Sequence, residues 1–278
     1  MIDAHRPEIQ LSHTESGEGE TLLLLHGSAS TGAVWRRYVD PFAKRGYRVI
    51  VPDLIGYGKT SAWPRERRYT LDCEVELARR LLPRDGRRFH VVGHSFGGVV
   101  ALGLALTNPS ELASLTLIEP VAFFVLRYAH ESEAYAEISG IRDSFLGELD
   151  KGRGEEALRA FLGYWTGPGS WDAMPERARN EVLRSVEKLR LDFEASFNTD
   201  PGEEAIRGIR APTLLVQGTK STLPARRIIA ALSGMLPQAE LQVVDGANHL
   251  LPLTHAPVLT ESVLRYLDAT TKALSRRA

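Results

Sequence analysis

The 278-residue sequence contains little of what would indicate a disulfide-rich, membrane-bound or nucleic-acid-binding protein. Its single cysteine, Cys73, rules out an intramolecular disulfide and is consistent with a reducing compartment such as the cytoplasm. No apolar run approaches the length of a membrane-spanning helix, and no signal peptide is visible at the N-terminus. A formal net charge of −1 gives no electrostatic reason to bind nucleic acid or an anionic membrane. We therefore expect a cytoplasmic protein that acts on a small molecule, and its oligomeric state stays open.

Metal-ligand and phosphate-binding patterns are also missing from the sequence. The eight histidines are not clustered with the spacing of metal ligands, and the glycine-containing loops do not match a phosphate-binding pattern. We therefore expect neither a metal nor an organic cofactor.

Short apolar runs that alternate with helix-period stretches are the main pattern that is present. The helix-period stretches include residues 96–106 and 258–267. The runs that we predict as strands are residues 21–25, 47–51, 89–92, 114–118, 212–216 and 240–244. Continuous apolar strands alternating with helices favour an α/β protein with a mainly parallel sheet that is covered on both faces.

One long segment, residues 121–206, interrupts this alternation. It is amphipathic with a helical period, rich in Glu and Arg, and without a convincing strand. We predict that it is a helical cap inserted into a core formed by residues 1–120 and 207–278.

The most informative segment is Gly93–Gly97, which follows a strand-like run and precedes an apolar helix. Ser95 lies in it with a glycine two positions before and two positions after. A serine on a tight strand-to-helix turn has a strained backbone and needs very small neighbours at those positions. The turn exposes the hydroxyl and directs the helix N-terminus at the atom that it attacks. This pattern predicts that Ser95 is a nucleophile.

Four landmarks in order along the chain resemble the α/β-hydrolase fold superfamily in its helical-cap branch. They are His26-Gly27-Ser28 followed by Trp35, then Pro52–Gly58, Gly93–Gly97 and Gly246–His249. The resemblance covers essentially the whole chain and implies an eight-stranded type of mainly parallel sheet. It says little about the substrate, because this fold hosts many reactions.

A serine nucleophile needs a base, and His249 is our choice among the eight histidines. His249 follows the predicted strand 240–244 through a glycine-containing loop, where the order of Ser, acid and His in this fold expects the base. His94 occupies the serine turn, so its side chain should point away from Ser95. His255 directly precedes a helix and is expected at the helix entry.

The negative oxygen of a tetrahedral intermediate requires hydrogen-bond donors that are already in place. The backbone N–H of Phe96, at the start of the helix, is one expected donor. The family pattern implies that the backbone N–H of Ser28 is the other. Since the Ser28 side chain is not needed for this role, Ser28→Ala should have little effect.

The acid is where this sequence departs from the usual family pattern. Relatives commonly have an aspartate three residues after the glycine that ends the penultimate core strand, and here that position is Ser221. We expect Glu119 to replace it, from the end of the strand after the nucleophile's strand, held extended by the proline that follows. Alternatives are that Glu119 only pairs with an arginine, or that Ser95 and His249 work as a dyad helped by Ser221 or water. Asp245 is disfavoured because it lies at a strand exit.

The substrate is predicted only in outline. Cap aromatics suggest an apolar pocket between cap and core, although each could equally belong to the cap's own core. The residues proposed to line the pocket are Phe123, Phe124, Tyr164 and Trp165, with Trp171 nearby. We expect a small or medium apolar carboxylic ester to be hydrolysed through an acyl-enzyme on Ser95.

Several other functions stay open. Haloalkane dehalogenases and epoxide hydrolases of this fold use an aspartate nucleophile, which residue 95 does not provide. The remaining alternatives are a C–C bond hydrolase of ring-cleavage dienoates, a thioesterase or lactonase, and a cofactor-free perhydrolase. A non-enzymatic ligand-binding protein or a decayed hydrolase is supported only by the missing acid at Ser221.

Overall fold

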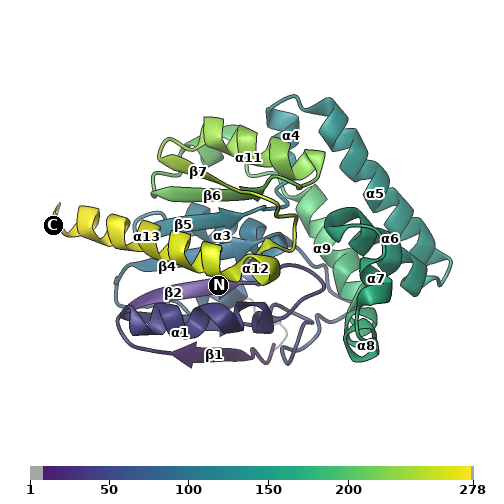
Figure 1. The fold of residues 1–278 in the computed structure, drawn as a ribbon, viewed down its shortest axis with the longest axis horizontal. Helices are drawn as coiled ribbons and strands as arrows, with labels where there is room; N and C mark the ends of the chain where they lie inside the picture. Colours follow the sequence, from purple (N-terminus) through teal and green to yellow (C-terminus); the bar gives the residue numbers. More distant parts are fainter. Residues whose placement is uncertain (1–8, 277–278) are drawn as a thin grey trace.

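A seven-stranded sheet lies at the centre of the computed structural model, which describes residues 9–276 (Figure 1). Its strand order is β1-β3-β2-β4-β5-β6-β7, and all neighbouring strands are parallel except β1 and β3. The strands are β1 (His13–Ser16), β2 (Glu20–Leu25), β3 (Tyr47–Pro52), β4 (Phe89–His94), β5 (Leu112–Ile118), β6 (Thr213–Gly218) and β7 (Ala239–Val244). This is the mainly parallel sheet expected for the α/β class.

The six strands predicted from apolar runs are all present, each within two residues of its expected ends. The additional strand, β1, pairs antiparallel with β3 at the edge of the sheet. Its four residues are polar and mostly exposed, so it carries no apolar run by which it could have been predicted. The described residues therefore form seven strands instead of the eight-stranded type implied by the resemblance.

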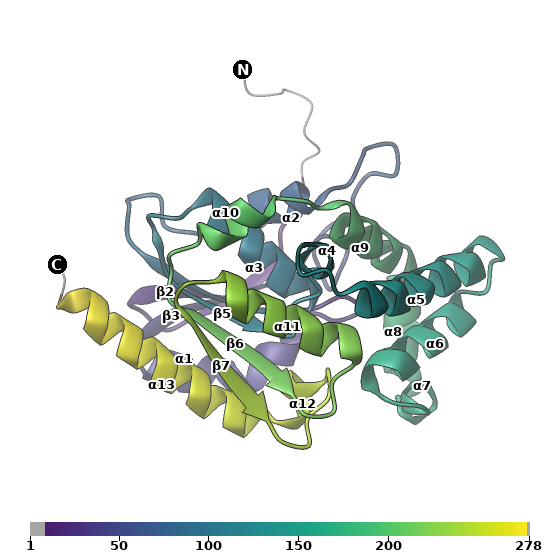
Figure 2. The ribbon, with the colours of Figure 1, turned by 90° about the horizontal axis from the view of Figure 1, so that it is seen from above.

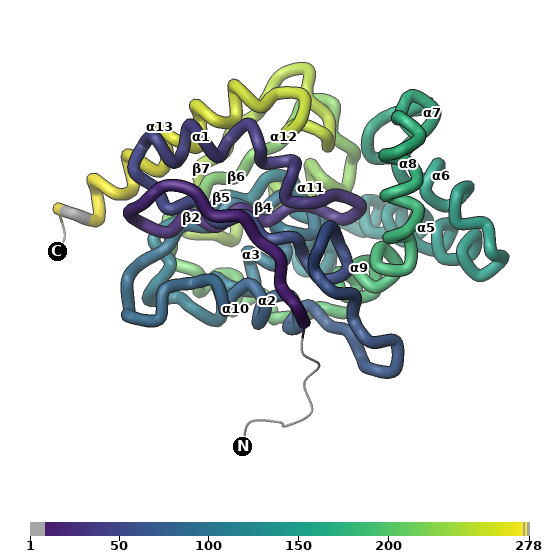
Figure 3. Tube along the Cα trace, turned by 90° about the horizontal axis from the view of Figure 1, so that it is seen from below, coloured from purple at the N-terminus to yellow at the C-terminus, as the bar shows by residue number. Residues whose placement is uncertain are grey.

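Helices cover both faces of the sheet, as Figures 2 and 3 show from opposite sides. Helices α1, α12 and α13 lie on one face, and α2, α3, α10 and α11 lie on the other. The bounds are α1 (Arg36–Lys44), α2 (Leu71–Arg79), α3 (Phe96–Thr107), α10 (Glu203–Arg207), α11 (Leu223–Met235), α12 (Leu251–Thr254) and α13 (Ala256–Ser275), and a 3₁₀ helix precedes α1 at Gly32–Trp35.

Alternating side chains of the central strands supply the two cores. In β2, Leu22 and Leu24 pack into the core beneath α1 and α13, whereas Leu23 and Leu25 pack into the core on the other face. All four leucines are fully buried. This explains the uninterrupted apolar run in the sequence, because a strand with helices on both faces has no exposed side.

The segment between β5 and β6 contains helices joined by loops and no strand, as the sequence predicts. Figure 1 shows α5, α6, α7 and α8 gathered beside the sheet, at the end toward which its parallel strands point. The helices of this segment that precede α10 are α4 (Phe124–Tyr128), α5 (Ser132–Asp150), α6 (Gly154–Thr166), α7 (Ser170–Ala173), α8 (Glu176–Arg184) and α9 (Val186–Asn198). The division of the chain into a core and a cap with boundaries at 121 and 206 stays a prediction. None of the helices between residues 9 and 276 is long and apolar enough to cross a membrane.

Candidate active site

Ser95 lies on a sharp turn between β4 and α3 and has a strained backbone. Its φ is 55° and its ψ is −120°, a conformation that residues with a side chain rarely adopt. The flanking glycines are required by the tightness of this turn. A Cβ at position 93 would collide with the carbonyl of Gly97, and one at position 97 would collide with the carbonyls of Leu25 and His26. The spacing seen in the sequence therefore has the steric cause that we expected.

Three loops at the carboxyl ends of the strands bring Ser95, His249 and Glu119 together. The Nε2 atom of His249 is 3.0 Å from Ser95 Oγ, and its Nδ1 atom is 2.7 Å from Glu119 Oε2. These residues follow β4, β7 and β5, so they are far apart in sequence but meet at one edge of the sheet. All three are buried. With Nδ1 protonated and donating to Glu119, Nε2 is free to accept the Ser95 proton.

Glu119 is fully buried, and its carboxylate accepts several hydrogen bonds. Oε1 accepts from the backbone N–H of Gly218 at 2.9 Å and from the hydroxyl of Ser221. Burial by itself would raise the pKa of Glu119, but the interaction with His249 and these two donors outweigh it and lower the pKa below its usual value. Ser221, at the position where relatives commonly have the acid, thus serves here as a donor to the carboxylate that reaches His249.

The backbone of Glu119 differs from our expectation. We expected the following proline to hold it extended, but its φ is 43°, on the left-handed side. Its N–H donates to the carbonyl of Val216 on the neighbouring strand β6 at 3.0 Å. The sharp turn after β5 therefore sets the backbone conformation of Glu119. A non-glycine residue with a strained backbone of this kind persists only where surrounding contacts stabilise it.

The imidazole of His249 is held from two further sides. The indole ring of Trp165, at the end of α6, lies against it with ring centroids 4.4 Å apart. The Nε2 atom of His94 donates to the carbonyl oxygen of His249 at 2.9 Å, and the expectation that its side chain points away from Ser95 stays a prediction. Burial, followed by proximity to His249, lowers the pKa of His94 well below its usual value, so it is a neutral support at this position.

The loop after β2 packs directly against Ser95. A Cβ on Gly27 would lie 2.8 Å from the Cβ of Ser95, so only glycine fits at this contact. His26 shapes the loop, because Nδ1 donates to the carbonyl of Gly27 at 2.7 Å and Nε2 accepts from the N–H of Leu54 at 2.9 Å. Ser28 lines the same cavity as Ser95. Phe96 is the first residue of α3, where an N–H has no acceptor within its own helix.

A small cavity of about 20 Å³ borders Ser95, which is room for about one water molecule. Its lining residues are Ser28, Ser95, Val121, Phe123, Phe161, Trp165, Leu189, Asp192, Phe193 and Ser196. Of the predicted pocket residues, Phe123 and Trp165 are in this lining. The other two are not: Phe124 packs against Tyr128, and the hydroxyl of Tyr164 donates to Glu137 at 2.6 Å.

Sequence reasoning missed the contribution of α9, which supplies four of these lining residues. It also missed a buried polar cluster on that helix. Asp192 Oδ2 accepts from the hydroxyl of Ser28 at 2.6 Å and from that of Tyr57 at 2.7 Å, and Asp192 pairs with Lys188. The four-residue spacing of Lys188 and Asp192 fits a helix pair, but nothing in the sequence indicates that the pair is buried. The Ser28 side chain therefore has a partner that we did not foresee when we expected Ser28→Ala to have little effect.

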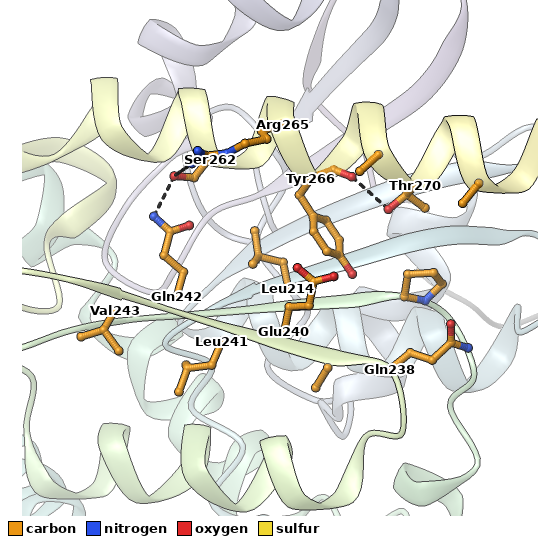
Figure 4. Close-up of a pocket in the computed structure, with 14 residues that line it drawn as sticks. Leu214, Gln238, Glu240, Leu241, Gln242, Val243, Ser262, Arg265, Tyr266 and Thr270 are labelled. Atoms are coloured by element: carbon orange, nitrogen blue, oxygen red, sulfur yellow. Dashed lines mark hydrogen bonds between the residues drawn. The ribbon is translucent and has the colours of Figure 1, made fainter.

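A larger cavity lies elsewhere, between the edge strand β7 and helix α13 (Figure 4). Its volume is about 770 Å³, and its lining includes none of Ser95, Glu119 and His249. Gln242 donates to the hydroxyl of Ser262 across it at 2.7 Å. Within residues 9–276 no group of three or more His, Cys, Asp or Glu side chains is placed to hold a metal ion.

The fold and the arrangement at Ser95 define a class, which comparison with known proteins also identifies. A family model described as the alpha/beta hydrolase fold matches residues 20–256, and the chain belongs to this family of enzymes.

Similar proteins in this family carry out different reactions. The chain is 35% identical to a 2-hydroxy-6-oxononadienedioate/2-hydroxy-6-oxononatrienedioate hydrolase of Paraburkholderia xenovorans, over 94% of this chain and 91% of the relative. It is 30% identical to the pimeloyl-(acyl-carrier protein) methyl ester esterase of Aeromonas hydrophila, over 90% of this chain and 96% of the relative. The solved structure of MGS-M2, an alpha/beta hydrolase enzyme from a Medee basin deep-sea metagenome library, superposes with a TM-score of 0.78. It is 19% identical and covers 95% of this chain and 96% of its own, which supports the fold alone.

Proposed function

We propose that this protein is a serine hydrolase that cleaves a small or medium apolar carboxylic ester through an acyl-enzyme on Ser95. The observation that carries the proposal is the continuous chain of contacts from Ser95 Oγ through His249 to Glu119, at 3.0 Å and 2.7 Å. Each contact has the length that proton transfer or orientation of the imidazole requires. The serine, the base and the acid take these roles in the mechanism below.

In the first half of the reaction, Ser95 Oγ attacks the ester carbonyl carbon while His249 Nε2 takes its proton. The negative oxygen of the tetrahedral intermediate is stabilised by the backbone N–H groups of Ser28 and Phe96. The C–O bond to the alcohol then breaks, and the alcohol leaves with the proton that His249 returns. Glu119 remains ionised and stabilises the imidazolium.

In the second half, water attacks the acyl-enzyme. His249 takes a proton from this water, and the N–H groups of Ser28 and Phe96 again face the developing negative oxygen. The Ser95–acyl bond breaks, His249 returns the proton to Ser95 Oγ, and the carboxylic acid is released. The chemistry requires no group beyond these side chains, the two N–H groups and water.

The relatives support an ester or C–C bond as the scissile bond. One relative is named as a methyl ester esterase, and the apolar aromatic lining near Ser95 suits the acyl part of such a substrate. The second candidate is hydrolysis of a C–C bond in a dienoate, which is favoured by the relative that is 35% identical.

The test uses 4-nitrophenyl esters of increasing acyl length, one dienoate, and a fluorophosphonate that labels active serines. We expect ester hydrolysis with covalent labelling at Ser95, and a loss of kcat/KM on the order of 10⁴-fold in Ser95→Ala. Ser110→Ala, which alters a serine in an exposed loop, should match the parent protein. Retained turnover in Ser95→Ala would refute the proposal, and turnover of the dienoate alone would favour the second candidate.

A further inference from the structure

The cavity beside Ser95 has an apolar wall and a small polar wall, and Asp192 supplies the charge of the polar wall. Phe123, Phe161, Trp165 and Phe193 form the aromatic part. Asp192 comes from α9 and is almost completely buried, with 2% of its surface exposed. Hydroxyl and ammonium groups donate to both of its oxygens, as they would to an ionised carboxylate.

Lys188 lies next to Asp192, but its ammonium group has no donor left for a ligand. It pairs with Asp192, lies 3.1 Å from Glu74 Oε1, and donates to the hydroxyl of Tyr69 at 2.8 Å. An ammonium group has three N–H donors, and these three oxygens use them all. The ammonium group of Lys188 is therefore fully paired with groups of the protein and is not available to pair with a substrate carboxylate.

The remaining groups of the cluster are also unable to attract an anion. Ser28 and Tyr57 each have one hydroxyl proton, and both protons are directed at Asp192 Oδ2. Two carboxylates, Glu74 and Asp192, share one ammonium, so the three ionisable side chains sum to a formal charge of −1. The lining of the cavity, taken over the described residues, contains an aspartate and no lysine or arginine.

We propose that Asp192 determines substrate specificity by excluding acyl groups that carry a carboxylate, so that the natural substrates are neutral esters or lactones. This inference rests on the proposed serine hydrolase function and adds the substrate class. A carboxylate that enters this cavity is removed from water and meets a negative wall without a cation to pair with. The cavity has room for about one water molecule, so an acyl group bound to Ser95 has to widen it, and a neutral group then contacts the four aromatic rings without this electrostatic cost.

Trp165 provides a donor that suits a neutral substrate. Its indole N–H is buried and, within the described residues, has no hydrogen-bond partner. A buried donor without a partner is costly, and an ester or lactone oxygen would satisfy it where a bound substrate widens the cavity and uncovers the indole nitrogen. One neutral N–H does not compensate a full negative charge, so it does not make the cavity suitable for an acid.

The proposal separates this chain from the relative named as a dienedioate hydrolase, whose named substrate carries two carboxylates. Overall similarity to that relative would suggest anionic substrates here as well. The polar wall made by Asp192 predicts the opposite preference.

The experiment compares two esters that differ in one charge, mono(4-nitrophenyl) glutarate and methyl 4-nitrophenyl glutarate. Both have the same leaving group, so the ratio of their kcat/KM values reports the acyl side. We expect the parent protein to favour the neutral ester by on the order of a hundredfold, since a charge a few ångströms away in a site of low dielectric has an effect of this size. Asp192→Asn retains the shape and one acceptor oxygen, and it should reduce the ratio at least tenfold.

The matched control is Glu187→Gln, which removes a carboxylate from the exposed side of the same helix. It should leave the ratio unchanged. If the parent protein hydrolyses the neutral and the charged ester with similar kcat/KM values, the specificity proposal is refuted. This test needs no variant, so it remains decisive even if Asp192→Asn does not fold. A ratio that persists in a folded Asp192→Asn protein also refutes it. If neither ester is hydrolysed and Ser95 is not labelled by the fluorophosphonate, the proposed function fails, and this inference fails with it.

Discussion

Glu119 supplies a carboxylate next to His249, whereas the usual family pattern has the acid at the position of Ser221. The residue at the common acid position is a serine, and its hydroxyl donates to a carboxylate that comes from the neighbouring strand. The same carboxylate reaches His249 Nδ1 at 2.7 Å. Strands β5 and β6 are parallel neighbours, and Ile118 at the end of β5 pairs with Val216, two residues before the end of β6, so carboxylates that follow either strand can reach the same region. The absence of an acid near residue 221 is therefore no argument for a decayed site.

Replacing Glu119 by glutamine tests this relation. Glu119→Gln retains the size of the side chain but removes the charge that would hold the imidazole and stabilise its protonated form. We expect kcat to fall on the order of a hundredfold or more, by analogy with triads that lose their acid. The measurement is steady-state hydrolysis of a 4-nitrophenyl ester.

Asp245→Asn is the control for this prediction. Asp245 is the other carboxylate near His249 in sequence, but it is exposed and accepts from the hydroxyl of Thr219. This variant should retain kcat within about twofold, as surface substitutions usually do. An unchanged kcat in a folded Glu119→Gln protein would remove Glu119 from the mechanism.

Helix α9 lies in the helical segment between β5 and β6 and contacts both α2 and the loop after β2. Its Lys188 contacts Glu74 of α2, and its Asp192 contacts Ser28 of the loop after β2. Burial raises the pKa of Asp192, and the neighbouring Lys188 opposes this rise. Ion pairs of the buried Lys188 with Glu74 and Asp192 therefore help to hold α9 against the rest of the molecule.

Lys188→Met should destabilise the protein strongly. The ammonium is almost completely buried, and its removal leaves the carboxylates of Glu74 and Asp192 without a compensating charge. Loss of one partner of a buried ion pair costs about 3–5 kcal/mol. Chemical denaturation at neutral pH measures the change in the free energy of unfolding.

Arg190→Met provides the comparison on the same helix. Arg190 pairs with Asp150 and Glu187, both of which are largely exposed. Exposed ion pairs contribute about 0–1 kcal/mol, so this variant should change the free energy of unfolding by no more than that. Equal losses in the two variants would mean that the buried cluster has no special role in stability.

At the scale of the whole molecule, two buried histidines make stability depend on pH. Burial lowers the pKa of His26 to about 4, and that of His94 lies well below its usual value. The unfolded chain binds protons at these residues near pH 6.5, whereas the folded protein does not. Their stabilising contribution is therefore complete above about pH 6.5 and decreases as the pH falls toward the folded-state pKa.

His26→Gln isolates one of these contributions. Glutamine can donate and accept in the loop but does not titrate. The variant should be less stable than the parent at pH 7, and this difference should shrink by about 2 kcal/mol at pH 5. The measurement is chemical denaturation at both pH values, with His13→Gln on the exposed strand β1 as the control. Parallel stability losses of parent and His26→Gln over this pH range would contradict the prediction.

Local patterns in the sequence were sufficient to predict most of the strands and the turn at Ser95. The glycines around Ser95 predicted the tight turn, because a Cβ at either position meets backbone atoms. Runs of apolar residues predicted six of the seven described strands. Five of these, β2 to β6, are buried along most of their length, whereas the edge strand β7 is largely exposed. The family's order of elements led to His249, and the missing acid directed attention to Glu119, which the structure places in contact with each other. Their catalytic roles remain proposals.

The lining of the cavity and the buried polar contacts depend on long-range packing instead. Which aromatics line the cavity beside Ser95 depends on how α9 and α6 lie over the sheet, and helical period alone cannot choose between Phe161 and Phe124. The role of Ser221 as a donor to Glu119 and the burial of Lys188 with Asp192 depend on contacts between residues about a hundred positions apart or more. Contacts at such separations are set by the three-dimensional path of the whole chain, which no short stretch of sequence encodes.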